Sequence, residues 1–319
     1  MTVSRLSGVW LAIALLASVG LASAQAQPDR QVAITIDDLP AGNAESMNAG
    51  TLTEMTSKIL VALRQHNAPA VGFVNEVKLY KAGEVDARIK VLNMWLDAGF
   101  ELGNHTFHHT SLNRAGLQAW EDDTIQGESV IKILLAQHNM KLRYFRHPYL
   151  DTGLDLQTRR EAEAFLSRRG YQVAPVTVDG WDWNFGGVYE AAKKRGDTAL
   201  MQEVVRLYLS HHDEMFAWCE QVSREVVGYE PKQVLLLHGN ELEGDHLGEL
   251  LDLIKKRGYR FIKLEDALED SAYGLPNTYV GVEGMSWLEQ WGISKGKPPQ
   301  GAPEFPPKIA EMTKAMRGY

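Results

Sequence analysis

Short apolar runs alternate along this chain with longer amphipathic segments, and this alternation constrains the fold more than any other feature of the sequence. The apolar runs have the length and composition of buried strands, and turn-forming residues bound them. They are Val32–Ile36, Ala70–Asn75, Phe100–Gly103, Leu142–Phe145, Tyr171–Val178, Val234–Leu237 and Tyr259–Lys263. Strands that alternate with helices form a parallel sheet covered by helices, so the pattern predicts an α/β fold. An open doubly wound sheet and a closed barrel both fit this periodicity.

The segments between these runs carry apolar residues at helical spacing, and several end at a glycine. The expected helices are Leu52–His66, Val85–Leu96, Leu117–His138, Leu156–Arg169 and His246–Lys256. The stretch Gly187–Glu230 is longer than one crossover helix needs. It predicts two helices, broken near Gly196-Asp197, inserted beside the core.

The sequence predicts a leader, a core domain and a C-terminal extension. Residues 1–24 carry one charge, an apolar run and the ending Ala22-Ser23-Ala24, which is typical of a signal peptide. The apolar run is shorter than the roughly 20 residues that span a bilayer, so we expect export to the periplasm or medium and no stable membrane anchor after cleavage. Residues 25–270 form the predicted core domain, with its insertion at about 187–230. Residues 271–319 are expected to pack on that domain.

Composition excludes some classes of protein. The chain has 319 residues, of which 45% are hydrophobic and 23% are charged, so it can bury a large core. Its formal net charge of −8 argues against a nucleic acid as partner, because binding one requires clustered Lys and Arg. Cys219 is the only cysteine, so it forms no internal disulfide, and we expect a buried side chain. The sequence leaves the oligomeric state open.

Titratable residues collect at the ends of the predicted strands. Asp37-Asp38, His105, Arg146, Asp179 and His238 follow five different strands. Because the carboxyl ends of parallel strands meet at one edge of the fold, these side chains are expected to surround one site.

Asp37 and Asp38 directly follow Val32–Ile36. Successive residues of a strand point in opposite directions, so one carboxylate would be free to bind a metal while the other accepts protons. A helix cap or an Asx turn before Leu39-Pro40 is the alternative interpretation of this pair.

His105 and His109 are four residues apart, and on one helical turn both imidazoles would face the same way, with His108 pointing elsewhere. Such a pair alone is equally compatible with a structural role. Asp38 would add the anionic ligand. Two imidazoles and one carboxylate leave positions open for water and substrate, as in a catalytic metal site.

The other strand ends offer groups for proton transfer and for sugar binding. Arg146 has the planar fork that pairs with a carboxylate, although a surface arginine beside Pro148 is an alternative. Asp179-Gly180-Trp181-Asp182-Trp183 puts two acids and two aromatic platforms together, and spacing does not say which acid matters. His238 ends a buried strand, where it suits either proton transfer or a structural role.

Five motifs therefore stand in a fixed order: Thr35 to Asp38, His105 to His109, Arg146 to Tyr149, Asp179 to Trp183, and Leu235 to His238. In this order the chain resembles the NodB-homology polysaccharide deacetylases, carbohydrate esterase family four, from about Val32 to Lys263. The resemblance implies an irregular (β/α)7 barrel.

The resemblance also implies a role for each matching residue. Asp38, His105 and His109 would hold a divalent metal, usually zinc, with cobalt and manganese as alternatives. Asp37 would be the general base, paired with Arg146.

His238 would be the general acid, oriented by Asp182, and the backbone N–H of Tyr149 would stabilise the oxyanion. Trp183 and Leu236 would enclose the acetyl methyl group.

The activity that the resemblance implies is the removal of N-acetyl groups from a glycan by metal-activated water. Hydrolysis of another linear or cyclic amide, or of an O-acetyl ester, is the first alternative, because the same attack serves any such carbonyl. A glycan-binding protein without turnover is the second. Leu39-Pro40 and Leu150 stand where the family usually has glycine, which leaves the substrate open.

Overall fold

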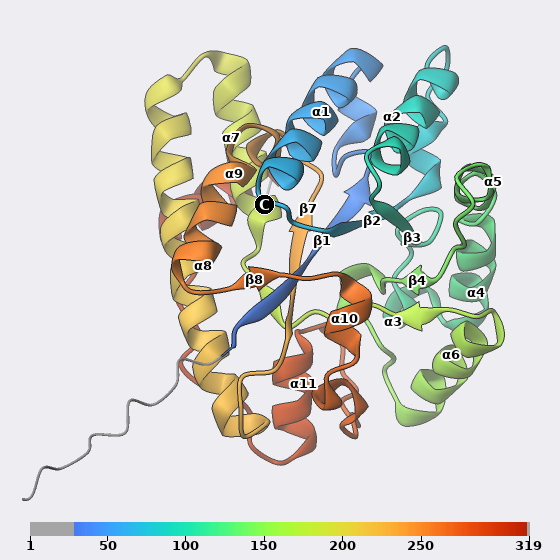
Figure 1. Ribbon diagram of the computed structural model, residues 1–319, viewed down its shortest axis with the longest axis vertical. Helices are drawn as coiled ribbons and strands as arrows, with labels where there is room; N and C mark the ends of the chain where they lie inside the picture. Colours follow the sequence, from blue (N-terminus) through green and yellow to red (C-terminus); the bar gives the residue numbers. More distant parts are fainter. Residues whose placement is uncertain (1–28, 318–319) are drawn as a thin grey trace, which may run out of the picture.

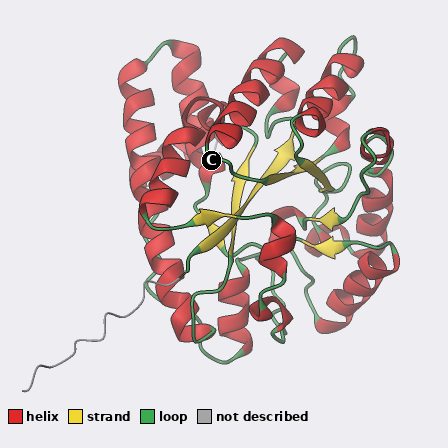
Figure 2. Ribbon diagram, viewed as in Figure 1, coloured by secondary structure: helices red, strands yellow, loops and turns green. Residues whose placement is uncertain are grey.

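The computed structural model describes residues 29–317 and shows a curled parallel sheet flanked by helices (Figures 1 and 2). The predicted signal peptide, residues 1–24, lies outside the described residues. The strands are β1 Gln31–Leu39, β2 Ala70–Val74, β3 Glu101–Asn104, β4 Tyr144–Phe145, β5 Gln172–Val173, β6 Val178–Asp179, β7 Gln233–His238 and β8 Arg260–Phe261. The helices are α1 Ala49–Gln65, α2 Val85–Asp97, α3 Leu112–Ala115, α4 Leu117–Gln126, α5 Ile131–Gln137, α6 Leu156–Arg168, α7 Asp182–Arg195, α8 Thr198–Val226, α9 Glu241–Lys256, α10 Leu264–Leu268, α11 Trp287–Ser294 and α12 Pro307–Arg317.

The strands follow the order β5-β4-β3-β2-β1-β7-β6, and β8 pairs with the start of β1. Every pairing among the described residues is parallel. Figure 1 shows α7, α8 and α9 grouped on one flank, and α4, α5 and α6 on the other. The predicted α/β class is confirmed, and the curled half-barrel agrees with an irregular (β/α)7 barrel.

Two segments that were predicted as single elements are each divided. Tyr171–Val178 forms β5 and β6, which lie at opposite ends of the strand order. Pro175 stands between them, and a proline has no N–H with which to continue a ladder. Leu117–His138 forms α4 and α5, with Gly127 at the end of α4.

The predicted break between two long helices at Gly196-Asp197 is confirmed. Gly196 ends α7 with a φ of 69°, a left-handed conformation that favours glycine. The Asp197 carboxylate accepts a hydrogen bond from the N–H of Leu200 and thereby caps α8.

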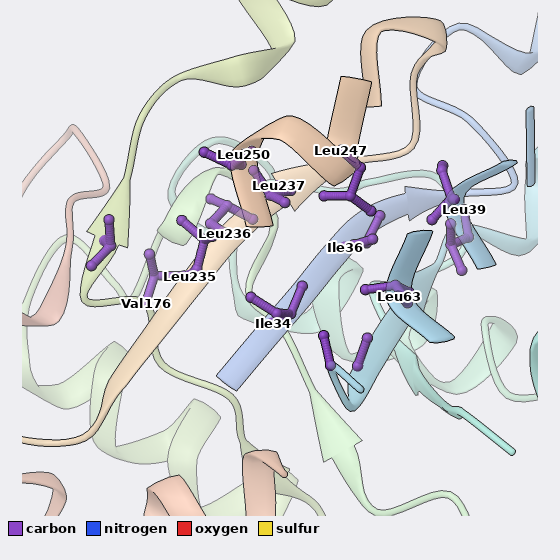
Figure 3. Close-up of a cluster of buried hydrophobic side chains, with 14 of the residues drawn as sticks. Ile34, Ile36, Leu39, Leu63, Val176, Leu235, Leu236, Leu237, Leu247 and Leu250 are labelled. Atoms are coloured by element: carbon purple, nitrogen blue, oxygen red, sulfur yellow. The ribbon is translucent and has the colours of Figure 1, made fainter. Parts of the chain in front are cut away.

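Strand β1 separates two apolar layers. Ile34 and Ile36 face the helices, where α1 and α9 contribute Leu63, Leu247 and Leu250 (Figure 3). Ala33 lies on the opposite face, in a cluster inside the curl of the sheet with Val71, Phe73, Tyr144, Ala174 and Val234. Because strand side chains alternate, Thr35 and Asp37 continue this inner column toward the carboxyl end of the strand.

The C-terminal segment is part of the same folded body. Trp291 in α11 is 1% exposed, and the N–H of Trp287 donates to the carbonyl of Val176 at 2.7 Å. Cys219 is buried, as predicted, and its Sγ lies 3.4 Å from the carbonyl of Thr177. Within residues 29–317, no helix has the length and apolar character needed to cross a bilayer.

We expect Leu237→Ala to lower the free energy of unfolding by about 2–5 kcal/mol, because Leu237 is fully buried in β7 between β1 and the helix layer. Urea denaturation monitored by circular dichroism measures the change. Val61→Ala is the control, since Val61 is 49% exposed, and its effect should stay within about 0.5 kcal/mol. Equal effects of the two substitutions would contradict this description of the core.

Candidate functional site

The carboxyl ends of the strands surround a pocket of about 1350 Å³. The predicted site residues that line it are Asp37, Asp38, His105, His109, Tyr149, Asp179, Trp183, Leu236 and His238. Arg146 and Asp182 are both 0% exposed and contact lining residues from beneath. The structure therefore brings together all of the residues that the sequence singled out.

Asp38, His105 and His109 offer one donor atom each, and these three atoms lie within 4.8 Å of one another. Asp38 Oδ1 lies 3.9 Å from His105 Nε2 and 3.7 Å from His109 Nε2. Within the described part of the chain this buried oxygen accepts no hydrogen bond of regular geometry, although the Lys78 ammonium forms an ion pair with it at 3.1 Å. The Nδ1 of His105 lies 2.9 Å from the carbonyl of Arg146, which favours the tautomer with a lone pair on Nε2. The donor set fits a divalent cation such as zinc.

The two histidines reach this position from a loop, so the predicted helical turn is wrong. Residues 105–110 contain no helix, and Thr106 and His109 have φ values of 62° and 61°. The rings nevertheless lie 4.7 Å apart. His108 points elsewhere, as predicted, with its Nδ1 2.6 Å from Asp123. A loop held by Asn75 Nδ2, which donates to the carbonyl of His105 at 2.6 Å, replaces the helix.

The expected opposite orientation of Asp37 and Asp38 is also wrong. Asp37 Oδ2 lies 3.6 Å from His105 Nε2, the same nitrogen that faces Asp38. The reason is the φ of 69° at Asp38, which interrupts the strand alternation and turns the second carboxylate back toward the first. The register of β1 against β2 shifts at this point.

We call Asp38, His105 and His109 the donor triad, and burial determines the protonation state of its two histidines. It lowers the pKa of His109 to about 4 and that of His105 well below the ordinary value, so both rings are neutral at neutral pH, the form that binds metals. Burial opposes ionisation of Asp38 too, but the Lys78 ammonium, the nearest permanent positive charge, holds the pKa of this carboxyl below its usual range.

Lys78 is a site residue that the sequence analysis missed. Its side chain is 7% exposed, and its Nζ lies 3.1 Å from Asp38 Oδ1 and 3.4 Å from the carbonyl of Asp38. Its position, just past the end of β2, was the available signal, because that strand end lies beside those of β1 and β3.

Asp37 is paired with Arg146 beneath the pocket. Arg146 Nη1 lies 3.3 Å from Asp37 Oδ2, its Nη2 donates to Thr35 Oγ1 at 2.8 Å, and its Nε donates to the carbonyl of Ala174 at 2.8 Å. Burial raises the pKa of Asp37 to about 6 even though the guanidinium favours the charged form. Asp37 Oδ1 accepts no hydrogen bond from the described residues, so one oxygen stays available.

His238 and Asp182 form the second pair. Asp182 Oδ1 lies 2.7 Å from His238 Nδ1, and its Oδ2 accepts hydrogen bonds from the backbone N–H of His238 and from Asn240 Nδ2, both at 2.9 Å. Burial of the ring opposes its charge, but the Asp182 carboxylate more than offsets this and raises the pKa of His238 to about 10. Asp179 instead accepts the N–H of Trp181, so the geometry distinguishes the two acids.

The loop after β4 contributes Tyr149, whose φ of 57° lies in the left-handed region. Its ring centre lies 4.4 Å from that of His109 with the two planes tilted by 59°, and the Arg114 guanidinium lies 4.8 Å from the Tyr149 ring centre. Trp183 and Leu236 line the pocket near His238, and Trp183 is 38% exposed. The arrangement combines a candidate cation site, a carboxylate, a protonated imidazole and an aromatic wall.

Comparisons with known proteins point to one family. Residues 24–168 match the profile of the polysaccharide deacetylase family. The peptidoglycan-N-acetylglucosamine deacetylase of Bacillus cereus is 24% identical over 247 residues, which cover 76% of this chain and 69% of that protein.

Solved structures align at lower similarity. A CE4 family pseudoenzyme from Bacillus anthracis aligns with a TM-score of 0.49 and 19% identity, over 75% of this chain and 66% of its own. A family 4 carbohydrate esterase from Streptomyces lividans in complex with acetate aligns with a TM-score of 0.47 and 21% identity, over 74% of this chain and 95% of its own.

We expect Asp182→Asn to lower the pKa of His238 from about 10, because the carboxylate is the main group that favours the charged ring. NMR titration of the imidazole in the metal-free protein measures the shift. Since the folded pKa lies above the unfolded one, the pair stabilises the fold fully below pH about 6.5, and the stabilisation is lost as pH rises through about 10. Asp179→Asn is the control and should shift the pKa less; equal shifts would contradict the assignment.

We expect Lys78→Met to raise the affinity for zinc, because the ammonium competes with a cation for Asp38 Oδ1. The metal-free variant should melt at a lower temperature, since Asp38 loses its partner, and zinc should raise that temperature by more than in the parent. Isothermal titration calorimetry and thermal melts measure both effects. Lys78→Arg keeps the charge and serves as control. A zinc affinity of Lys78→Met equal to that of the parent protein would show that Lys78 does not compete with the metal.

Proposed function

We propose that this protein is a metal-dependent hydrolase of the polysaccharide deacetylase type that removes N-acetyl groups from an N-acetylated glycan. The match of residues 24–168 to the profile of that family supports the proposal. The observation that carries the proposal is that two pairs of residues able to accept or donate a proton lie around the donor triad. Asp37 with Arg146, and His238 with Asp182, lie at the same pocket as Asp38.

In this proposal Asp38, His105 and His109 hold a divalent metal, with zinc as the first choice and cobalt or manganese as alternatives. A metal in such a site acidifies water and polarises a carbonyl oxygen. Neutral imidazoles and an ionised carboxylate are the forms that this role requires, and they agree with the direction of the pKa shifts.

Asp37 is the proposed general base. A pKa of about 6 leaves it ionised at neutral pH while making it a better proton acceptor than an ordinary aspartate. The Arg146 guanidinium fixes one carboxylate oxygen and leaves Oδ1 to take the proton of the attacking water.

His238 is the proposed general acid. Asp182 keeps its ring protonated and fixes its Nδ1, so that Nε2 is the atom that delivers a proton to the leaving nitrogen. The backbone N–H of Tyr149 is proposed to stabilise the oxyanion. Trp183 and Leu236 are proposed to contact the acetyl methyl group, since both line the pocket.

The name of the Bacillus cereus relative, a peptidoglycan-N-acetylglucosamine deacetylase, supports an N-acetylated amino-sugar glycan as the substrate class. Another linear or cyclic amide, or an O-acetyl ester, remains the alternative substrate. Action outside the cytoplasm is a proposal that depends on the N-terminal sequence alone.

We expect the zinc-reconstituted protein to release acetate from N-acetylglucosamine oligomers, and Asp37→Asn and His238→Ala each to lower kcat by about 10²–10⁴-fold, the usual contribution of one general acid or base. An enzymatic acetate assay measures the rate, and a chelator should abolish it. O-acetylated xylan and small imides, assayed in parallel, test the alternative substrates.

Asn43→Ala serves as the control, because Asn43 lines the same pocket but hydrogen-bonds Glu190 rather than either proton-handling pair. Full activity in both Asp37→Asn and His238→Ala would overturn the assigned roles. Tight glycan binding with no turnover in zinc, cobalt or manganese would identify a binding protein instead.

A further inference from the structure

The strand ends do not form the pocket alone, because the C-terminal segment supplies part of its wall. The contributing residues are Glu283, Gly284, Phe305, Ala310, Thr313, Lys314 and Met316. We call residues 283–316 the C-terminal wall. It meets the pocket at two places, at the loop that carries Tyr149 and along α7.

The first contact is between the C-terminal wall and the Tyr149 loop. A β-carbon added at Gly284 would lie 1.9 Å from the carbonyl oxygen of Tyr149, so only glycine allows the two backbones to approach this closely. Shortly before Gly284 in the chain, the carbonyl of Gly281 accepts a hydrogen bond from Asn113 Nδ2 at 2.9 Å. The wall therefore lies directly against the loop that is proposed to stabilise the oxyanion.

The second contact is an aromatic anchor at Phe305. Its ring lies 5.5 Å from Trp181, 5.1 Å from Phe185 and 5.4 Å from His211, which come from the start of α7 and from α8. Trp218 Nε1 in α8 donates to the carbonyl of Gln300 at 2.9 Å. The two long helices thus hold the wall in place.

Helix α12 is fixed on the pocket in a defined orientation. Ile309 is 0% exposed and belongs to the main core. Ala310, Thr313 and Lys314 are three and four residues apart, so they share one helical face, and that face lines the pocket. Met316 reaches α7, where its Cε lies 3.7 Å from the position of a β-carbon at Gly187.

We infer that the C-terminal wall limits substrate length, so that the site takes short N-acetylated oligosaccharides or the end of a chain rather than the interior of a long polymer. The inference rests on the proposed function and names its substrate class. An interior sugar needs a groove that continues past the site in both directions, whereas here α12 and the Gly284 segment occupy the rim beside α7 and Tyr149. The pocket is open to solvent on one side, and its volume of about 1350 Å³ exceeds the roughly 300–1,000 Å³ of an ordinary ligand pocket, so several sugar units fit.

The first experiment maps products on the reconstituted protein. N-acetylglucosamine oligomers, from the dimer to the hexamer, and soluble polymeric substrate are compared by kcat/KM, and mass spectrometry locates the deacetylated unit. We expect terminal deacetylation, kcat/KM that stops rising after a few units, and weak activity on the polymer. Deacetylation of interior units as readily as terminal ones would overturn the inference.

The second experiment changes the wall itself. Phe305→Ala removes the anchor and should raise the ratio of polymer to dimer kcat/KM by at least about tenfold, while Met316→Trp should lower the ratio of hexamer to dimer. Glu311→Trp is the matched control, since Glu311 is exposed on α12 and does not line the pocket. Thermal melts confirm folding. Unchanged ratios in both wall variants would overturn the inference.

Different results would contradict the proposed function and the proposed role of the C-terminal wall. Absence of acetate from every substrate would overturn the proposed function, and the wall is then tested by calorimetry of the same oligomers on the His238→Ala protein. Affinity that stops increasing after a few sugar units supports the wall, and affinity that rises through the hexamer overturns it.

Discussion

The buried guanidinium of Arg146 is the interaction on which the inside of the sheet depends. It comes from the end of β4, is 0% exposed, and bonds to Thr35 and Asp37 on β1 and to the carbonyl of Ala174 after β5. In the order of the sheet β5 is next to β4, but β3 and β2 separate β4 from β1. Removing a charge from water costs several kcal/mol unless partners compensate, so the curl of the sheet must keep these strand ends together.

The same burial separates the proton affinities of the site. It raises the pKa of Asp37 to about 6 and lowers the pKa values of both histidines of the donor triad. The pKa of His238 shifts in the opposite direction, to about 10, because the buried Asp182 carboxylate pairs with the ring and favours its charged form. Two groups whose environments push their pKa values apart provide a base and an acid at the same pH.

Much of this architecture was predictable from local sequence. Alternating apolar runs and amphipathic segments predicted the α/β class, and the titratable residues at strand ends predicted one shared rim. The failures occur where long-range packing decides the backbone. Thr106 and His109 adopt left-handed conformations that bring two histidines together without a helix, and Asp38 does the same beside Asp37. Spacing assumes regular structure, so it cannot report such exceptions.

The sequence by itself determined which chemistry the rim carries, because strand periodicity and residue order place Asp38, His105 and His238 at carboxyl ends wherever the sheet is parallel. Only the tertiary structure decided what surrounds them. Three contacts join residues that are far apart in the chain. The Lys78 ammonium lies beside Asp38, Asp182 rather than Asp179 pairs with His238, and the Phe305 ring packs against α7 and α8. Local periodicity contains no record of such contacts, since they arise from how the whole chain excludes water and pairs its buried charges.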